Sequence, residues 1–269
     1  MASAEPLAGL VPVASLWIGG ALRWLDRLAL HSFVQRGHGV TLYHTAAQPP
    51  EVPDGVATRP AAEVFDPTTL PGLGPAQAAD LFRLHLQQAT DQIWMDTDVL
   101  CLRPLVLTDG WLVGHEHGGW VNNAVLRMPN GTPALEELIA TLSDPQAVPD
   151  WLPPEHQATV TAAPRHERLA TACRLVPNLT GPRALTAVLP RHGDDRHALP
   201  MQALNPLPWR LGDAWFNPHG GVTGWLGTNT MVAHLYTSRL RAIHLRSRPR
   251  RGSFLSDFAD EIGFSFQGA

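Results

Sequence analysis

Residues 79–105 read ADLFRLHLQQATDQIWMDTDVLCLRPL, and they decide the fold expected of this chain. Residues 77–89 place apolar side chains at helical spacing, which predicts an amphipathic helix. The short apolar run 92–95 predicts a buried strand that ends directly at Asp96-Thr97-Asp98. In an open α/β sheet, ligands bind at the carboxyl ends of strands, so this strand end is the first place to expect a site.

The flanking sequence extends this pattern in both directions. On the amino-terminal side, residues 11–18, 22–33 and 40–44 predict a strand, a helix and a second strand, a unit that makes the two strands parallel. The proline-rich stretch 48–75 is expected to be loop. On the carboxyl-terminal side, 111–114 and 124–128 predict strands and 133–142 predicts a helix. We therefore predict an α/β fold with a mixed, mainly parallel central sheet flanked by helices.

Composition and charge exclude several classes of protein. The chain has 269 residues and a net charge of -4, with no lysine, which argues against a broad nucleic-acid-binding surface. Two distant cysteines, Cys101 and Cys173, favour a reduced, cytoplasmic protein. Neither a positively charged signal segment nor an apolar run of membrane-spanning length is expected, so membrane contact is at most peripheral, at the inner face.

Asp96 and Asp98 are the candidate metal ligands. Side chains alternate along an extended strand, so both carboxylates are expected on one side and Thr97 on the other. Oxygen ligands of this kind suit Mn²⁺ or Mg²⁺ and leave coordination positions for diphosphate oxygens. The alternative interpretation is a solvated turn or strand end.

Asp80 and Arg83 lie on the helix that precedes this strand. They are three residues apart, so they share a face and are expected to project into one site. The carboxylate can accept hydrogen bonds from sugar hydroxyls, and the guanidinium can meet a phosphate or a sugar oxygen. The alternative interpretation is an ion pair on the helix surface.

These residues together resemble a known family. Ala79-Asp80, Arg83, Asp96, Asp98 and Arg103-Pro104-Leu105 follow one another as in glycosyltransferases that have a sugar-binding region with an Asp-x-Asp motif. The family includes capsular-polysaccharide synthesis enzymes, α-1,6-mannosyltransferases, α-1,4-galactosyltransferases of glycolipids and, more distantly, glucosylating clostridial toxins. The chain departs from the family at residues 89–92 (ATDQ), where Gly-Gly is usual, so the turn from helix to strand is expected to differ.

The resemblance implies a GT-A-like domain over residues 1–269, with a nucleotide-sugar-binding half (1–110) and an acceptor-side half (111–269). It implies a hexosyltransferase of bacterial polysaccharide biosynthesis that takes a UDP- or GDP-sugar and a divalent metal, and acts on a glycan or lipid-linked acceptor with retention. The implied catalytic residues are Asp80, Arg83, Asp98 and Asn123, with Asn122 as the neighbour of Asn123. The implied nucleotide-sugar-binding residues are Trp17, Ile18, Gly19, Asp80, Arg83 and Asp96, and the implied metal ligands are Asp96, Asp98 and His234.

Several other segments have two interpretations. His234 is either a metal ligand or a packed histidine, and His115 and His117 favour a polar loop over a zinc site. Residues 144–164 and 217–229 are expected to be flexible loops, the second of which carries Trp225 as a lid or an anchor. The arginine cluster at 246–251 is either solvated or in contact with an anionic acceptor or membrane.

Two other functions use the same residues. A haloacid-dehalogenase-like phosphatase would take Asp96 as nucleophile and Asp98 as acid/base, but such enzymes normally add a lysine, which this chain lacks. A non-catalytic nucleotide-sugar-binding protein would keep the fold and lose turnover.

Overall fold

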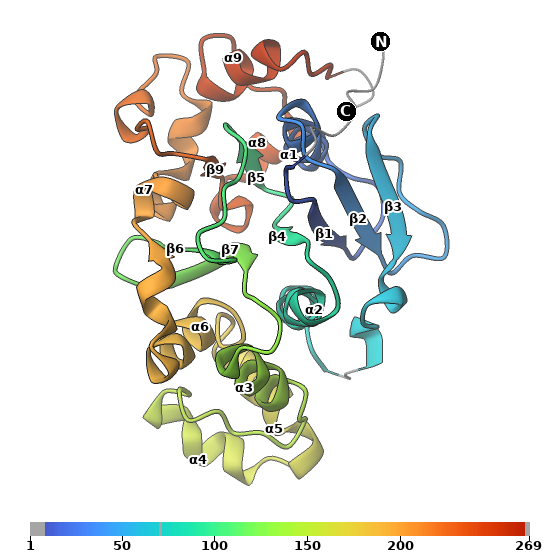
Figure 1. The fold of residues 1–269 in the computed structure, drawn as a ribbon, viewed down its shortest axis with the longest axis vertical. Helices are drawn as coiled ribbons and strands as arrows, with labels where there is room; N and C mark the ends of the chain where they lie inside the picture. The colour runs from blue at the N-terminus through green and yellow to red at the C-terminus, as the bar shows by residue number, and fades with distance from the viewer. Residues whose placement is uncertain (1–8, 70–71, 267–269) are drawn as a thin grey trace.

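The computed structural model describes residues 9–69 and 72–266, and a seven-stranded sheet forms its centre (Figure 1). The strand order is β3-β2-β1-β4-β7-β6-β8, and a separate two-stranded sheet pairs β5 with β9. The strands are β1 (Val13–Trp17), β2 (Val40–His44), β3 (Val56–Pro60), β4 (Ile93–Met95), β5 (Val99–Cys101), β6 (Leu112–His115), β7 (Val121–Arg127), β8 (Ala198–Leu199) and β9 (Val232–His234).

The main sheet is mixed and mainly parallel, as predicted. The pairs β1–β2, β1–β4, β2–β3 and β6–β8 are parallel, whereas β4–β7 and β6–β7 are antiparallel. The antiparallel β7 joins the later part of the chain to β4, with Trp94 opposite Leu126. Strands β1 and β4 therefore lie side by side in the interior of the sheet, and their carboxyl ends share one edge.

Helices cover both faces of this sheet. They are α1 (Trp24–Gln35), α2 (Pro75–Ala89), α3 (Pro133–Leu142), α4 (Pro154–Ala162), α5 (Arg168–Leu175), α6 (Pro182–Val188), α7 (Met201–Leu204), α8 (Ala242–Arg246) and α9 (Phe254–Glu261). One apolar cluster joins α2, α3, α5 and α6 to the face that carries Ala14 and Leu16. Another joins α1 and β5 to the face that carries Val13.

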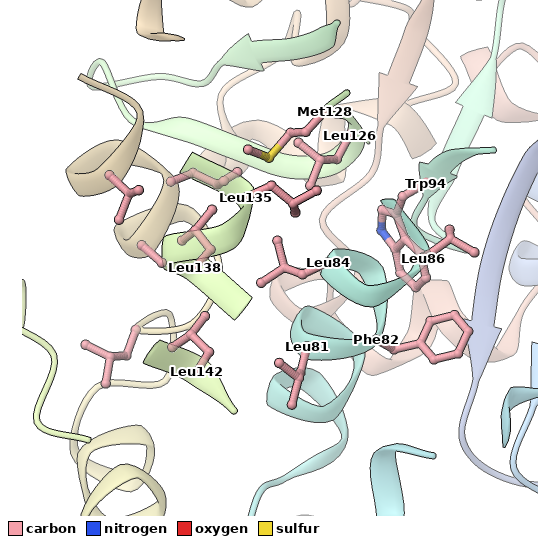
Figure 2. Packing of buried hydrophobic residues seen from close by; sticks show 14 of the residues in the cluster. Leu81, Phe82, Leu84, Leu86, Trp94, Leu126, Met128, Leu135, Leu138 and Leu142 are labelled. Carbon is pink, nitrogen blue, oxygen red and sulfur yellow. The ribbon is translucent and has the colours of Figure 1, made fainter. Parts of the chain in front are cut away.

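Helix α2 is held from two sides, which fixes its rotation. Figure 2 shows Phe82 and Leu86 on the side of Trp94, and Leu84 on the side of α3 near Leu138. The rings of Phe82 and Trp94 are 6.1 Å apart. Burying a leucine or phenylalanine side chain contributes about 1.5–3 kcal/mol each, so these contacts set which face of α2 remains for polar residues.

The ends of the first two long helices follow from their sequences. Helix α1 begins at a double contact between Arg23 and Asp26, because both the backbone N–H (2.9 Å) and the guanidinium (2.8 Å) of Arg23 donate to the Asp26 carboxylate. It ends at Gln35 with Arg36 as its C-cap, and the following Gly37 has a φ of +87°, a left-handed conformation that favours glycine. Helix α2 has Pro75 in its first turn, where the missing N–H has no partner to lose.

Two segments differ from the sequence-based expectation. The stretch 48–75, predicted as loop, contains β3, an edge strand parallel to β2. Its side chains are mostly exposed and it ends in Pro60, so it lacks the apolar alternation that marks a strand. The stretch 144–164, predicted as loop, contains α4, which begins with Pro154 and buries Val160. Among the described residues, no helix has both the length and the hydropathy needed to cross a membrane.

Candidate functional site

A cleft of about 540 Å³ opens at the carboxyl ends of β1 and β4. Of the residues predicted from the sequence to form the site, all except Gly19 line this cleft. They are Trp17, Ile18, Asp80, Arg83, Asp96, Asp98, Asn123 and His234. The neighbouring Asn122 also lines it, but its side chain is already hydrogen-bonded. Its Nδ2 donates to Glu116 Oε2 (2.8 Å), and its Oδ1 accepts from the Ala124 N–H (2.7 Å).

Asp96 and Asp98 converge, although not for the predicted reason. The strand stops at Met95, and residues 97–98 form a turn in which the Val99 N–H donates to the Asp96 carbonyl (3.1 Å). The turn, rather than the alternation of an extended strand, brings the two carboxylates together. One ligand atom from each of Asp96, Asp98 and His234 lies within 4.8 Å of the other two.

His234 reaches this position through the small second sheet. Strand β9 pairs with β5 so that His234 stands opposite Val99, and the Leu235 N–H donates to the Asp98 carbonyl (3.0 Å). The His234 Nε2 atom is 3.6 Å from Asp98 Oδ1, and its Nδ1 atom is 3.1 Å from Asn205 Oδ1. The ring is 6 % exposed and stacks on Tyr236 at a centroid distance of 3.7 Å.

The orientation of Asp98 is fixed by Thr237. Both the N–H and the hydroxyl of Thr237 donate to Asp98 Oδ2, at 2.8 and 2.9 Å. Tyr236, just before it, has a φ of +53°, a left-handed conformation that is uncommon for a non-glycine residue. Strained backbone of this kind persists where the surrounding structure imposes it, and here it directs the Thr237 N–H at the carboxylate.

Arg83 lies buried between two of the site carboxylates. Its Nη2 atom is 3.2 Å from both Asp80 Oδ1 and Asp96 Oδ1, and its guanidinium carbon lies 4.7 Å from the ring centroid of Trp94. Its Nη1 donates to the carbonyl oxygen of Asn123. The pair Asp80–Arg83 is therefore not a solvated pair on a helix surface, because Arg83 is 5 % exposed and faces the cleft.

Asp80 accepts hydrogen bonds from residues that lie 43 and 100 positions further along the chain. Asn123 Nδ2 donates to Oδ1 (2.8 Å) and the Thr180 hydroxyl donates to Oδ2 (2.6 Å). Gly181 packs so closely that an added Cβ would lie 2.7 Å from Asn123 Nδ2 and 3.0 Å from Asp80 Oδ2. This segment of the chain can approach Asp80 only because residue 181 has no side chain.

The electrostatics of the site set its protonation. Burial, together with the nearby Asp98 and Asp80 carboxylates, raises the pKa of Asp96 to about 7, against an opposing effect from Arg83 and the Trp94 N–H (2.8 Å). Burial lowers the pKa of His234, so its imidazole is neutral at physiological pH. The cleft thus holds one carboxylate that ionises at near-neutral pH beside an uncharged ring.

The three convergent groups fit a divalent cation. Asp96 Oδ2 has no hydrogen-bond partner among the described residues, and Asp98 Oδ1 faces only the imidazole. The neutral His234 contributes a lone pair on Nε2, because its Nδ1 faces an acceptor. Two carboxylate oxygens and one imidazole nitrogen, all electron-pair donors, suit Mn²⁺, with open positions left for a ligand.

Three residues of the site were not found from the sequence. Thr237 and Asn205 come to the site from segments far along the chain, and no local pattern marks them. Arg23 lines the cleft from the start of α1, and its hydrogen bonds to Asp26 raise its pKa, so it stays charged. The available signal for Arg23 was a basic residue three positions after Gly20, at the start of the predicted helix.

The remaining candidates lie outside the cleft. Trp225 is 41 % exposed and is not among the lining residues. His115 and His117 belong to no group of three or more metal-ligating side chains in the described part of the chain. The flexibility predicted for residues 217–229 stays a prediction.

No protein-family model and no curated protein matches the chain. Among solved structures, the chain is similar to one named PaToxG Glycosyltransferase, with 14 % sequence identity and a TM-score of 0.42. The similarity covers 72 % of this chain and 79 % of the other.

Proposed function

We propose that this protein is a metal-dependent glycosyltransferase, which transfers a hexose from a UDP- or GDP-sugar to a glycan or lipid-linked acceptor. One observation carries the proposal. Two carboxylates and a neutral imidazole converge on the wall of a cleft that also holds a buried group of Asp80, Arg83 and Asn123. The volume of about 540 Å³ lies in the range of small-molecule sites, which is roughly 300–1,000 Å³.

Asp96, Asp98 and His234 are the residues proposed to hold Mn²⁺ or Mg²⁺. When bound, the cation neutralises the diphosphate and stabilises it as a leaving group. Thr237 donates hydrogen bonds to Asp98 Oδ2, and Asp98 Oδ1 is directed toward His234. The protein itself therefore orients the atoms proposed as metal ligands. Arg23, charged and exposed to the cleft, adds positive charge beside the diphosphate.

Asp80 and Asn123 are proposed to bind the transferred sugar, with Arg83 fixing both. Each oxygen of a carboxylate has two lone pairs, so Asp80 Oδ2 can accept a sugar hydroxyl in addition to the Thr180 hydroxyl. The N–H groups of Arg83 are already directed at Asp80, Asp96 and the Asn123 carbonyl. We therefore assign Arg83 to holding these groups in place, and Trp17 and Ile18 to the nucleoside.

Transfer with retention of configuration is part of the proposal, because the family that the sequence resembles is retaining. A front-side displacement, in which the departing diphosphate accepts the acceptor proton, would need no base from the protein. The anomeric coupling constant of the first-formed product, measured by ¹H NMR, distinguishes retention from inversion.

The decisive experiment compares metal-dependent donor binding and sugar transfer between the wild type and a variant of one proposed metal ligand. Thermal unfolding is measured with a panel of UDP- and GDP-sugars, each with and without Mn²⁺, for the wild type, for Asp98→Asn and for the control Asp54→Asn. In Asp98→Asn the new amide oxygen could still accept the hydrogen bonds from Thr237, so the fold is expected to persist. Asp54 is exposed and far in sequence from the cleft residues.

We expect a metal-dependent shift with one donor class in the wild type and in Asp54→Asn, and loss of both the shift and sugar transfer in Asp98→Asn. Full transfer by Asp98→Asn, or by the wild type in excess EDTA, contradicts the proposal. Donor binding without turnover on any acceptor supports a binding protein instead. Hydrolysis of p-nitrophenyl phosphate through an aspartyl-phosphate supports a phosphatase.

We further propose that the acceptor is presented at an anionic membrane. Residues 239–251, named here the arginine segment, contain six arginines and no acidic residue. The segment begins directly after Thr237 and Ser238, which line the cleft. Arg241 pairs with Asp213 (2.9 Å), whereas Ile243, within the segment, is 60 % exposed. Clusters of four to eight basic residues attract anionic lipid surfaces.

A further inference from the structure

Asn205, directly after α7, occupies a buried position between β6 and β9. It is 3 % exposed, its Nδ2 donates to the His115 carbonyl oxygen (3.1 Å), and its Oδ1 lies 3.1 Å from His234 Nδ1. Turning the amide over would place Oδ1 against the His115 carbonyl, with two acceptors facing each other and no proton between them. The orientation of this amide is therefore set by its own hydrogen bonds.

This orientation dictates which ring nitrogen of His234 carries a proton. Because Asn205 Oδ1 can only accept, the Nδ1 atom that faces it must donate, and the neutral ring then has its lone pair on Nε2. Nε2 is the atom that lies 3.6 Å from Asp98 Oδ1. In the opposite tautomer Nε2 would carry the hydrogen, donate it to Asp98, and have no lone pair to offer a cation.

We propose that Asn205 is a positioning residue, which holds His234 in the tautomer protonated on Nδ1 and so keeps Nε2 available to a divalent cation. The inference deepens the proposed function and rests on its metal site. Metal-ligating histidines commonly donate their second ring N–H to a carbonyl or carboxylate, and the loss of that partner typically costs 10–100-fold in metal affinity. Here a side-chain amide takes that place.

The test reads the tautomer directly. Nitrogen-15 NMR of the imidazole at pH 8, without divalent cation, distinguishes the two tautomers by the shifts of Nδ1 and Nε2. We expect Nδ1–H in the wild type, and a shift toward Nε2–H in Asn205→Leu, since leucine offers no acceptor. Affinity for Mn²⁺ alone, measured by calorimetry, is expected to fall about 10–100-fold in Asn205→Leu.

A second variant separates positioning from packing. Asn205→Asp keeps an acceptor opposite Nδ1 but loses the donor to the His115 carbonyl, so we expect the wild-type tautomer and Mn²⁺ affinity within a few-fold of wild type. The matched control is Thr230→Val. It removes a buried polar contact beside β9, the Gly227 N–H to Thr230 hydroxyl bond (2.9 Å), without touching His234, and should leave the tautomer unchanged.

Two results would overturn the inference: Asn205→Leu with Nδ1–H and wild-type Mn²⁺ affinity, or Asn205→Asp behaving as Asn205→Leu does. Failure of the proposed function has a different outcome. If the wild type binds Mn²⁺ and shows the expected tautomers but transfers no sugar, the positioning role stands and glycosyl transfer does not. If Asp98→Asn abolishes transfer while Asn205→Leu changes neither the tautomer nor the Mn²⁺ affinity, glycosyl transfer stands and the positioning role of Asn205 does not.

Discussion

At the scale of single residues, Asp96 is held where ionisation is costly. Its pKa is raised from 3.8 to about 7 by burial and by its acidic neighbours. Between about pH 4 and pH 7 the folded chain therefore binds a proton that the unfolded chain has released. The free energy of unfolding falls as pH rises through this window. Above pH 7 the folded chain bears the full cost of ionising the buried Asp96 carboxylate.

Substitution Asp96→Asn is expected to stabilise the protein where that cost is present. Asparagine keeps an acceptor for the Trp94 N–H (2.8 Å) and carries no charge. In EDTA at pH 8 we expect the variant to unfold at a higher temperature than the wild type, by ~2–4 °C for each 1 kcal/mol relieved, with the difference vanishing near pH 4. Added Mn²⁺ should raise the unfolding temperature of the wild type only. A variant less stable than wild type at pH 8 would contradict this account.

Some residues of the site could be predicted from the sequence, and others could not. Asp80, Arg83, Asp96 and Asp98 lie within nineteen residues of one another, and their order along a helix and a strand placed them together. Asn205 and Thr237 act through contacts across 29 and 139 positions of the chain. No local periodicity reports such contacts, because they depend on how β9 and α7 pack.

At the scale of elements, the strands and helices with an apolar face were predictable and those without one were not. Helix α3 has the predicted bounds, and β2 also agrees. The edge strand β3 and helix α4, a helix with one buried residue, carry little apolar pattern. The turn at 97–98 was missed because Asp-x-Asp fits either an extended strand or a turn, and the backbone bond from Val99 to Asp96 decides between them.

The approach of the segment before α6 to α2 gives an element-scale prediction. Gly181→Ala would press a methyl group against Asn123 Nδ2 (2.7 Å) and Asp80 Oδ2 (3.0 Å). Overpacking of this kind costs about 1–3 kcal/mol, and it displaces the groups proposed to bind the sugar. We expect a lower unfolding temperature and a loss of transfer, measured as kcat/KM. The control Gly224→Ala, whose new methyl group would meet nothing within 4 Å, should retain wild-type stability. Unchanged kcat/KM in Gly181→Ala would show that the contact is dispensable.

At the scale of the whole molecule, the positions of the cleft and of the arginine segment determine which side of the protein would face a membrane. The cleft collects residues from the ends of β1 and β4, from α2 and from the segment after β9. Helix α8, within the arginine segment, lies toward one end of the molecule, whereas α4 and α5 lie toward the opposite end (Figure 1). A membrane that meets the arginine segment would therefore lie on the side of the cleft-lining residues 237–238 rather than on the side of α4 and α5.

This geometry predicts charge-dependent binding to vesicles. Arg246, Arg250 and Arg251 are exposed, and changing all three to glutamine removes about 1 kcal/mol of attraction each near an anionic surface, or roughly 100-fold in partitioning. We expect the wild type to sediment with vesicles containing phosphatidylserine, less so at high salt, and the triple variant to stay in solution while it keeps its donor binding. The matched control replaces the exposed Arg165, Arg174 and Arg196, which lie outside the arginine segment, and should sediment as the wild type does. Equal loss in both triple variants would mean that total charge, and not the position of the arginine segment beside the cleft, governs the attraction.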